Sequence, residues 1–313
     1  GYISTANNKT IGNEFPYYIS GLWADPSRSS RIKEFLEEDK KFSLEDMKAL
    51  QLDLTSNYSK EILPFILEHA GVFENPKFKR AIKFLKDWNN IESIDSEGTL
   101  IFHSISNQII RNVYYDELSV LGDKYFETFI GLKYITKRNL RNILRNNTNK
   151  WVDDIRTPNK IETIDEIITK SIESGIQKVV DTYGPNWSNW KWGDAHSLTH
   201  KHLLSKSSLL EKLFSLNVGP FRSGGSSKSP NAGGYSYNDP FEQKSGASMR
   251  RIVDLSNMNE TQCIIPTGQS GLSNSPHYRD QAEMFHGGLY RTTRFNEEYI
   301  RSSSGFKHLI LNP

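Results

Sequence analysis

The chain has 313 residues and a mass of 35.9 kDa, which is long enough to bury a sizeable core without disulfide or metal cross-links. Its 39 basic and 37 acidic residues leave a net charge of +2, which argues against a dedicated nucleic-acid binder. A mean hydropathy of −0.59, without an apolar run approaching ~20 residues, excludes a transmembrane helix. The single cysteine, Cys263, excludes an internal disulfide, a cysteine-rich zinc site and an iron–sulfur cluster.

The first 27 residues predict a strand followed by a loop. Residues 1–6 are rich in β-branched and aromatic side chains, which favour extended backbone, and Asn7 and Asn8 are expected to end the strand. Residues 9–27 hold two glycines and two prolines, which is typical of a loop.

From about residue 28 to 215 the spacing of apolar residues predicts a mostly helical region. One helix start is indicated at residues 27–29. Ser43, with Asp46 three positions later, resembles a capping box, and the dipeptide at 75–76 supplies an N-cap asparagine followed by proline.

Two further signals concern helices in the same region. Pro64 interrupts an apolar run, so a kink or break is expected there. Thr163 and Glu166 form a capping box ahead of the clearest amphipathic helix. Its apolar face is formed by Ile164, Ile167, Ile168, Ile172, Ile176, Val179 and Val180.

The composition changes after about residue 218. Residues 219–248 are rich in Gly, Ser, Asn and Pro and predict a long polar loop, either functional or mobile. Residues 249–255 and 262–266 predict two strands, and Ser275 with the following proline is expected to cap a helix running to about Phe285. The chain is therefore predicted to be α+β.

Three histidines, His196, His200 and His202, lie close together in the sequence. On a helix, His196 and His200 would share one face, as two zinc ligands do. The adjoining carboxylate that a metalloprotease needs is missing, so imidazoles hydrogen-bonded in a polar interior are favoured over a metal site.

Two other patterns do not make a catalytic set. The stretch 223–229 contains Lys228 but lacks the spaced glycines of a phosphate loop. Asp194, His196 and a serine are not accompanied by a Gly-x-Ser-x-Gly elbow, and Cys263 lies in a strand-like apolar run, where a lone thiol is usually a small, inert hydrophobic side chain. Residue patterns alone thus provide no complete catalytic centre.

Four stretches together resemble the penicillin acylase (penicillin amidase) family of N-terminal-nucleophile hydrolases. They occur in the family's order and extend over nearly the whole chain. They are Gly1–Asn8 (GYISTANN) with Phe15, Pro16, Trp23 and Arg28–Ile32 (RSSRI); Leu85–Trp88 (LKDW); Trp192–Leu203 (WGDAHSLTHKHL); and Met249–Ser256 (MRRIVDLS), Pro266–Gly271 (PTGQSG) and Ser275–Gln281 (SPHYRDQ).

The resemblance implies how the chain is produced and which part of the enzyme it represents. Family members cleave themselves into an α chain and a longer β chain that begins with the catalytic serine. Gly1 has no side-chain nucleophile, so we expect the serine and most of the acyl pocket upstream of this chain. The expected partners are therefore the α chain, the N-terminal part of the β chain and a small N-acyl substrate.

Two site residues map onto this sequence through the resemblance. Asn7 matches the family's oxyanion-hole asparagine, whose amide would donate to the developing negative charge, and Asn8 is a weaker match. Arg28, five residues after Trp23, matches the arginine that holds this asparagine and the nucleophile's amine. Calcium-binding relatives carry an acidic ligand where this chain has residues 17–19 (YYI), so no calcium site is expected in this segment, and calcium binding by the rest of the full-length protein stays open.

The implied organisation and function follow. Residues 1–27 would belong to the catalytic core of an αββα fold, 28–215 to a helical region, and 216–313 to a loop and strands returning to the core. The full-length protein to which this chain belongs would hydrolyse amides of N-acylated substrates such as penicillins, without an exogenous cofactor. The alternatives are an acyl-homoserine lactone acylase of the same family and an inactive fragment or binding module. Acyl-group specificity, cellular location and oligomeric state stay open.

Overall fold

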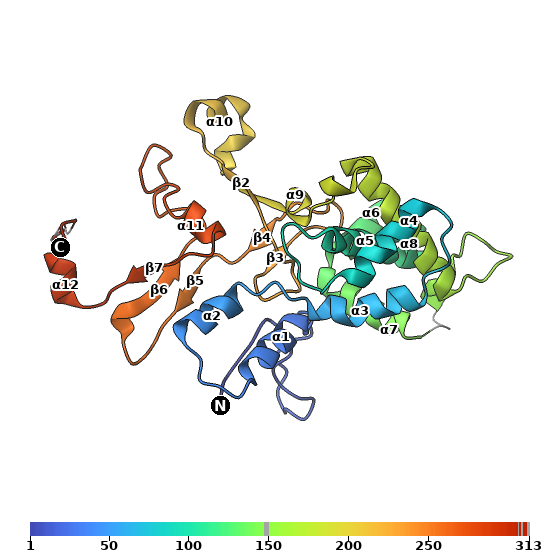
Figure 1. Cartoon of the computed structure of the whole chain (residues 1–313), viewed down its shortest axis with the longest axis horizontal. Helices are drawn as coiled ribbons and strands as arrows, with labels where there is room; N and C mark the ends of the chain where they lie inside the picture. The colour runs from blue at the N-terminus through green and yellow to red at the C-terminus, as the bar shows by residue number, and fades with distance from the viewer. Residues whose placement is uncertain (147–149, 306, 308, 312–313) are drawn as a thin grey trace. The chain divides into compact units, whose positions relative to one another are not determined.

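Helices make up most of the secondary structure between residues 27 and 214 (Figure 1). The structure is a computed structural model that describes residues 1–146, 150–305, 307 and 309–311. Its contacts divide the chain into two compact units, each formed by three stretches of sequence. Unit 1 comprises residues 1–39, 53–198 and 221–246, and unit 2 comprises residues 40–52, 199–220 and 247–313.

Unit 1 is helical. Its elements are α1 (Ser27–Leu36), α3 (Asn57–Glu68), α4 (Pro76–Asp87), α5 (Glu97–Ser119), α6 (Asp123–Gly131), α7 (Lys133–Leu144), α8 (Ile164–Tyr183) and α9 (Trp192–Ala195), the 3₁₀ helices η1 (Lys150–Val152) and η2 (Trp187–Asn189), and the paired strands β3 (Gly233–Gly234) and β4 (Ser245–Gly246). Two predicted helix starts are confirmed: Asn75 Oδ1 accepts a hydrogen bond from the Lys77 N–H at 2.9 Å, and Thr163 and Glu166 form a capping box on α8.

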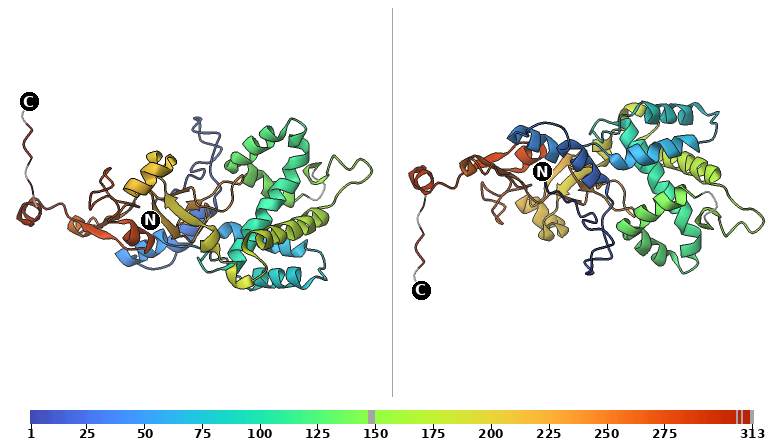
Figure 2. Two further views of the ribbon diagram at one scale, coloured as in Figure 1. Left: turned by 90° about the horizontal axis from the view of Figure 1, so that it is seen from above. Right: turned by 90° about the horizontal axis from the view of Figure 1, so that it is seen from below.

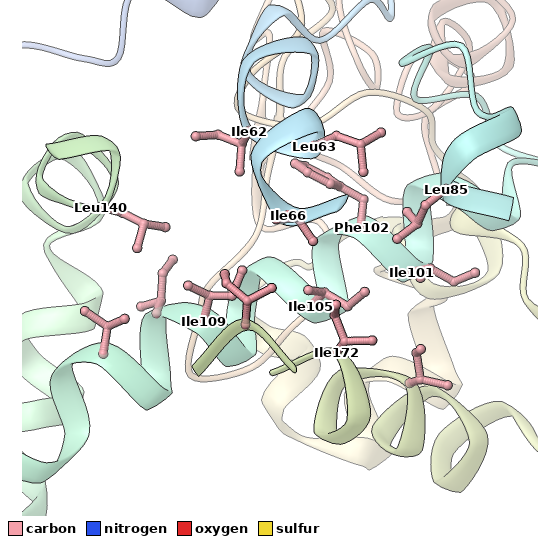
Figure 3. Packing of buried hydrophobic residues seen from close by; sticks show 14 of the residues in the cluster. Ile62, Leu63, Ile66, Leu85, Ile101, Phe102, Ile105, Ile109, Leu140 and Ile172 are labelled. Carbon is pink, nitrogen blue, oxygen red and sulfur yellow. The ribbon is translucent and has the colours of Figure 1, made fainter. Parts of the chain in front are cut away.

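The core of unit 1 is built around α5, which is buried on nearly every side and packs against α8, α4 and α6. Figure 3 shows Ile105 and Ile109 of α5 close to Ile172 of α8, and both views in Figure 2 show these two helices side by side. A Cβ on Gly175 would lie 2.9 Å from the Ile105 Cα, so this glycine permits the close approach of α8 to α5.

One prediction for unit 1 is wrong. Residues 1–6 form no strand, because their backbone pairs with no other strand among the described residues, and a strand exists only through such a ladder. Of the kink or break expected at Pro64, the break does not occur: helix α3 continues through this residue and buries Ile62, Leu63 and Ile66, and that apolar burial outweighs the lost backbone hydrogen bond.

The predicted polar loop is more ordered than its composition suggests. Strands β3 and β4 lie within residues 219–248, and Tyr237 and Phe241 are part of the hydrophobic core of unit 1. Aromatic side chains spaced among small residues therefore fix a segment that glycine and serine content alone describes as mobile.

Unit 2 is smaller and has more strand. Its three-stranded antiparallel sheet has the order β5 (Arg250–Ile252), β6 (Thr261–Ile264), β7 (Arg291–Thr293), which confirms the two predicted strands. Its other elements are α2 (Leu44–Gln51), η3 (Leu203–Lys206), α10 (Ser208–Phe214), η4 (Met258–Glu260), α11 (Ala282–His286) and α12 (Glu297–Ser302). A separate two-stranded sheet is formed by β1 (Ser197–His200) and β2 (Val218–Arg222), of which residues 197–198 and 221–222 are counted in unit 1 and the others in unit 2.

Two sequence signals in unit 2 have different outcomes. The capping box of Ser43 and Asp46 is present at the start of α2. The helix expected after Ser275 begins only at Ala282, because residues 272–281 form turns with hydrogen bonds such as Tyr278 N–H to Ser275 O. The α+β class is correct. Among the described residues, no helix is both long enough and apolar enough to span a bilayer.

Candidate functional site

Asn7 lies at a turn in the extended N-terminal segment of unit 1. Its φ of 63° is in the left-handed region, which asparagine tolerates better than most residues. Its backbone carbonyl accepts a hydrogen bond from the Ala24 N–H at 2.9 Å, so the turn is attached to the segment that precedes α1. The Asn7 side chain is exposed.

Arg28 in the first turn of α1 reaches back to this turn. Its Nη2 donates to the Ala6 carbonyl at 2.9 Å and to Asn7 Oδ1 at 2.8 Å. Because Oδ1 accepts from the guanidinium, the Nδ2 group is the end of the Asn7 amide that remains to donate. The arrangement therefore fixes an amide donor at the surface of unit 1.

The side chain of the neighbouring Asn8 makes different hydrogen bonds. Its Oδ1 accepts from the Ala6 N–H at 2.9 Å, and its Nδ2 donates to the Lys9 carbonyl at 2.9 Å. Both ends of the Asn8 amide therefore bond to local backbone and shape the turn, as asparagine commonly does. The geometry brings Arg28 together with Asn7 and not with Asn8.

A buried ionic cluster lies next to this turn. Asp25 is 8% exposed, and its carboxylate lies 2.5 Å from Arg141 Nη1 of α7 and 3.2 Å from Lys228 Nζ. Burial opposes its ionisation, but the charges of Lys228 and Arg141 and the hydrogen bonds from Ser27 lower the pKa of Asp25 to about 2. Asp25 is therefore ionised throughout the neutral range.

Sequence reasoning missed this cluster. Lys228 occurs in a glycine- and serine-rich stretch in which a lysine is ordinarily solvated, and neither Asp25 nor Arg141 carries a motif. The sequence offers one signal for Asp25, which is its position two residues before the predicted start of a helix. An acidic residue at such a position indicates helix capping, not a buried ion pair.

The three predicted histidines do not share a helix, because α9 ends at Ala195 and residues 197–200 form β1. His196 is buried and stacked on Trp192 with ring centroids 4.5 Å apart, and its Nδ1 lies 2.7 Å from the Phe241 carbonyl. Burial lowers the pKa of His196 to about 4, so this imidazole is neutral and part of the polar core.

The remaining candidates do not form a metal site. His200 Nε2 lies 3.2 Å from His286 Nε2, and His202 Nδ1 accepts from the Leu204 N–H. Residues 17–19 expose aromatic and aliphatic side chains, which are not calcium ligands, so this segment does not fit a calcium ion. Within the described residues no cluster of three or more His, Cys, Asp or Glu side chains is arranged to hold a metal. Cys263 lies in β6.

Comparison with known proteins gives a consistent result. A family model described as penicillin amidase matches residues 1–302. An acyl-homoserine lactone acylase QuiP from Pseudomonas syringae pv. syringae is 23% identical over 330 residues, covering 100% of this chain and 39% of the relative. Penicillin acylase 2 proenzyme from Pseudomonas sp. (strain SE83) is 23% identical and covers 90% of this chain and 35% of the relative.

A solved structure has the same fold. The thermostable penicillin G acylase from Alcaligenes faecalis superposes with a TM-score of 0.56 at 14% sequence identity, covering 99% of this chain and 56% of that one. The chain thus spans about two fifths of the length of the two curated relatives, of which it covers 39% and 35%.

Proposed function

Because the chain belongs to the penicillin amidase family, we propose that it is part of a hydrolase that cleaves the amide bond of N-acylated substrates. In this proposal the nucleophile is a serine upstream of Gly1. Its own α-amine takes the proton as the hydroxyl attacks the acyl carbon, and no exogenous cofactor takes part. The remainder of the β chain and the α chain are its proposed partners.

The observation that supports this proposal is the 2.8 Å hydrogen bond from Arg28 to Asn7 Oδ1. Attack on an amide places a negative charge on the former carbonyl oxygen. An amide N–H₂ held in a fixed direction stabilises that charge without reorganising during the reaction. Arg28 supplies the fixed direction, because its guanidinium stays charged and its donors are held in a plane.

Two substrate classes share this chemistry. Penicillins and related acyl amides are the first, and acyl-homoserine lactones are the second. The second class is supported by relatives named acyl-homoserine lactone acylase, which match 100% of this chain, whereas the relative named penicillin acylase 2 matches 90%. In both classes the scissile bond is an N-acyl amide.

The experiment begins with the coding sequence upstream of Gly1. A Ser, Thr or Cys at a cleavage junction is expected, and the lack of one would defeat the enzyme proposal in favour of a binding module. The intact protein is then assayed with a chromogenic phenylacetyl amide and with an N-acyl-homoserine lactone. Release of the free amine is the expected result, and a binding module would bind substrate without releasing product.

The 313-residue chain by itself is the matched control. It contains the proposed Asn7 donor but not the proposed nucleophile and base, and positioning alone cannot replace them. We expect no turnover from the purified chain. Appreciable turnover would mean that the catalytic centre lies within residues 1–313.

A further inference from the structure

The ionic cluster around Asp25 has no part in the chemistry proposed above, although it contains one buried cation, Lys228, and one partly buried cation, Arg141. We propose that Lys228 is a positioning residue: together with Arg141 it holds Asp25, and through Asp25 it holds the Arg28–Asn7 pair in place. The predicted effect of Lys228 on catalysis rests on the proposed function. The effect of Lys228 on the position of Asp25, Arg28 and Asn7 does not, and it can be tested without an activity assay.

The burial of Lys228 depends on its contacts with Asp25 and Tyr58. The residue is 3% exposed, its Nζ lies 3.2 Å from Asp25 Oδ2, and the ammonium lies 4.2 Å above the ring of Tyr58 in α3. Removing an ammonium from water is costly unless it is paired, so burial at this point depends on the Asp25 carboxylate. The aromatic face adds a weaker attraction.

The second carboxylate oxygen of Asp25 acts on α1. Oδ1 accepts the Ser27 N–H at 2.9 Å and also bonds the Ser27 hydroxyl, whereas Pro26, at the N-cap position, provides no side-chain cap. Asp25 therefore fixes the start of the helix whose next residue is Arg28.

A second connection runs through the backbone. The Ala24 N–H, adjacent to Asp25, donates to the carbonyl of Asn7 at 2.9 Å. Holding Asp25 thus restrains Asn7 from two directions, through the Ala24 hydrogen bond and through Arg28.

The two cations are not equivalent. Arg141 has a second carboxylate, since its Nε lies 2.8 Å from Glu61 Oε2. Among the described residues, Asp25 is the one carboxylate within ion-pair distance of Lys228. Loss of the Lys228 charge therefore leaves Asp25 with Arg141 alone as a cationic partner, and Arg141 is itself shared with Glu61.

The charge on Lys228 can be removed by pH. Burial lowers the pKa of Lys228 from 10.5 to about 8, although Asp25 opposes this shift; Arg141 lowers it further and Glu92 raises it. The unfolded chain binds more protons than the folded chain between pH 8 and 10.5, so this group's contribution to stability rises with pH. A local loosening near Asp25 at alkaline pH would therefore not be caused by global unfolding through Lys228.

The test measures amide hydrogen exchange in the intact protein that contains these 313 residues, expressed as protection relative to intrinsic rates. In Lys228→Met, which keeps an unbranched side chain one atom shorter and removes its charge, the Ala24 and Ser27 amides should lose about tenfold protection. Amides in the centre of α5 should keep theirs. Lys83→Met on α4, where Lys83 is exposed and pairs with Asp87, is the matched control and should change neither group.

A measurement on the unaltered chain covers the case in which Lys228→Met does not fold. Protection at Ala24 and Ser27 should fall between pH 7 and pH 9 while protection in α5 does not. Unchanged protection at both amides, in Lys228→Met or on raising the pH, would overturn the inference.

The catalytic consequence is tested separately in the intact enzyme. In the wild type kcat should fall as the pH rises through about 8, where Lys228 loses its charge. Lys228→Met should lower kcat about tenfold at pH 7 with KM changed less than about twofold, and its kcat should not fall further near pH 8. If the intact protein hydrolyses no amide, the proposed function fails but the exchange experiment still decides the positioning role. A Lys228→Met enzyme with wild-type kcat and an unaltered pH profile would contradict a role in catalysis.

Discussion

In unit 1 the α5–α8 pair and the segment before α1 are held by different forces. Ile105 and Ile172 are fully buried among other apolar side chains, and Gly175 allows the helices to approach closely. The segment before α1, by contrast, has no regular structure, and Asp25 holds it through a local hydrogen bond from the Ser27 N–H and through the charges of Arg141 and Lys228, which are distant in the sequence.

The difference determines how each region responds to change. Apolar packing is non-directional, so a lost contact is partly recovered when neighbours relax. A buried ion pair is directional, and removing one partner leaves the others desolvated and uncompensated. The α5–α8 pair should therefore lose stability in proportion to the atoms removed. The segment before α1 should lose its fixed position when a single charge is removed.

The largest effect is expected for Asp25→Asn. The substitution leaves the buried Lys228 without a carboxylate partner and Arg141 with Glu61 alone, and removal of one partner of a buried pair costs about 3–5 kcal/mol. Urea unfolding of the chain measures the loss. Asp87→Asn, at a surface carboxylate that is paired with Lys83, should change the free energy of unfolding little. A loss from Asp25→Asn as small as that of the surface control would show that the buried cluster contributes no net stability.

Ile172→Ala tests the apolar side of the comparison. The side chain is fully buried between α8 and α5, and truncation should lower the free energy of unfolding by about 2–5 kcal/mol. Ile161→Ala, where the residue is 82% exposed, is the control and should have little effect. Amide protection at Ala24 and Ser27 should persist in folded Ile172→Ala; its loss would mean that the two regions are not independent.

Acid should weaken the Asp25 cluster and leave the apolar contacts between α5 and α8 unchanged. The folded-state pKa of Asp25 is depressed from 3.8 to about 2, so its stabilisation is complete above the unfolded value and is lost as pH falls from about 4 to 2. This term amounts to about 2 kcal/mol. It is measured as the difference in unfolding free energy between wild type and Asp25→Asn at several pH values. A difference that does not shrink toward pH 2 would contradict the assigned pairing.

The smallest effect concerns the start of α8. Thr163 accepts from the Glu166 N–H, and Thr163→Ala should reduce stability by about 1 kcal/mol because one helix N–H loses its partner. Thr163→Ser keeps the hydroxyl and should stay near wild type in the same thermal unfolding experiment. Equal losses in both variants would attribute the effect to the threonine methyl group instead of the cap.

The same contrast explains what the sequence could predict. Helices α4 and α8 were predictable because their caps and apolar spacing are local signals, as at Asn75 and Thr163. Continuation of α3 through Pro64 was not, since it depends on burial against other helices. Nor was the absence of a strand at residues 1–6, which depends on whether another strand pairs with it.

In the candidate site, too, some residues could be identified from the sequence and others could not. Asn7 and Arg28 were singled out by family resemblance, not by any pattern in their surroundings, and their roles stay proposals. Asp25 and Lys228 are about 200 positions apart in the sequence and carry no motif, so only the fold brings their charges together. A buried charge is invisible in sequence until its partner is known.

The most direct test of the central claim is the turnover of Asn7→Gly in the intact enzyme, measured beside its melting temperature. Glycine accepts the φ of 63° without strain, so this variant removes the amide donor while preserving the turn. Oxyanion stabilisation by Asn7 predicts a fall in kcat of about 10²–10³-fold, with KM much less affected. A wild-type kcat per folded molecule, with or without a lowered melting temperature, would contradict the assignment.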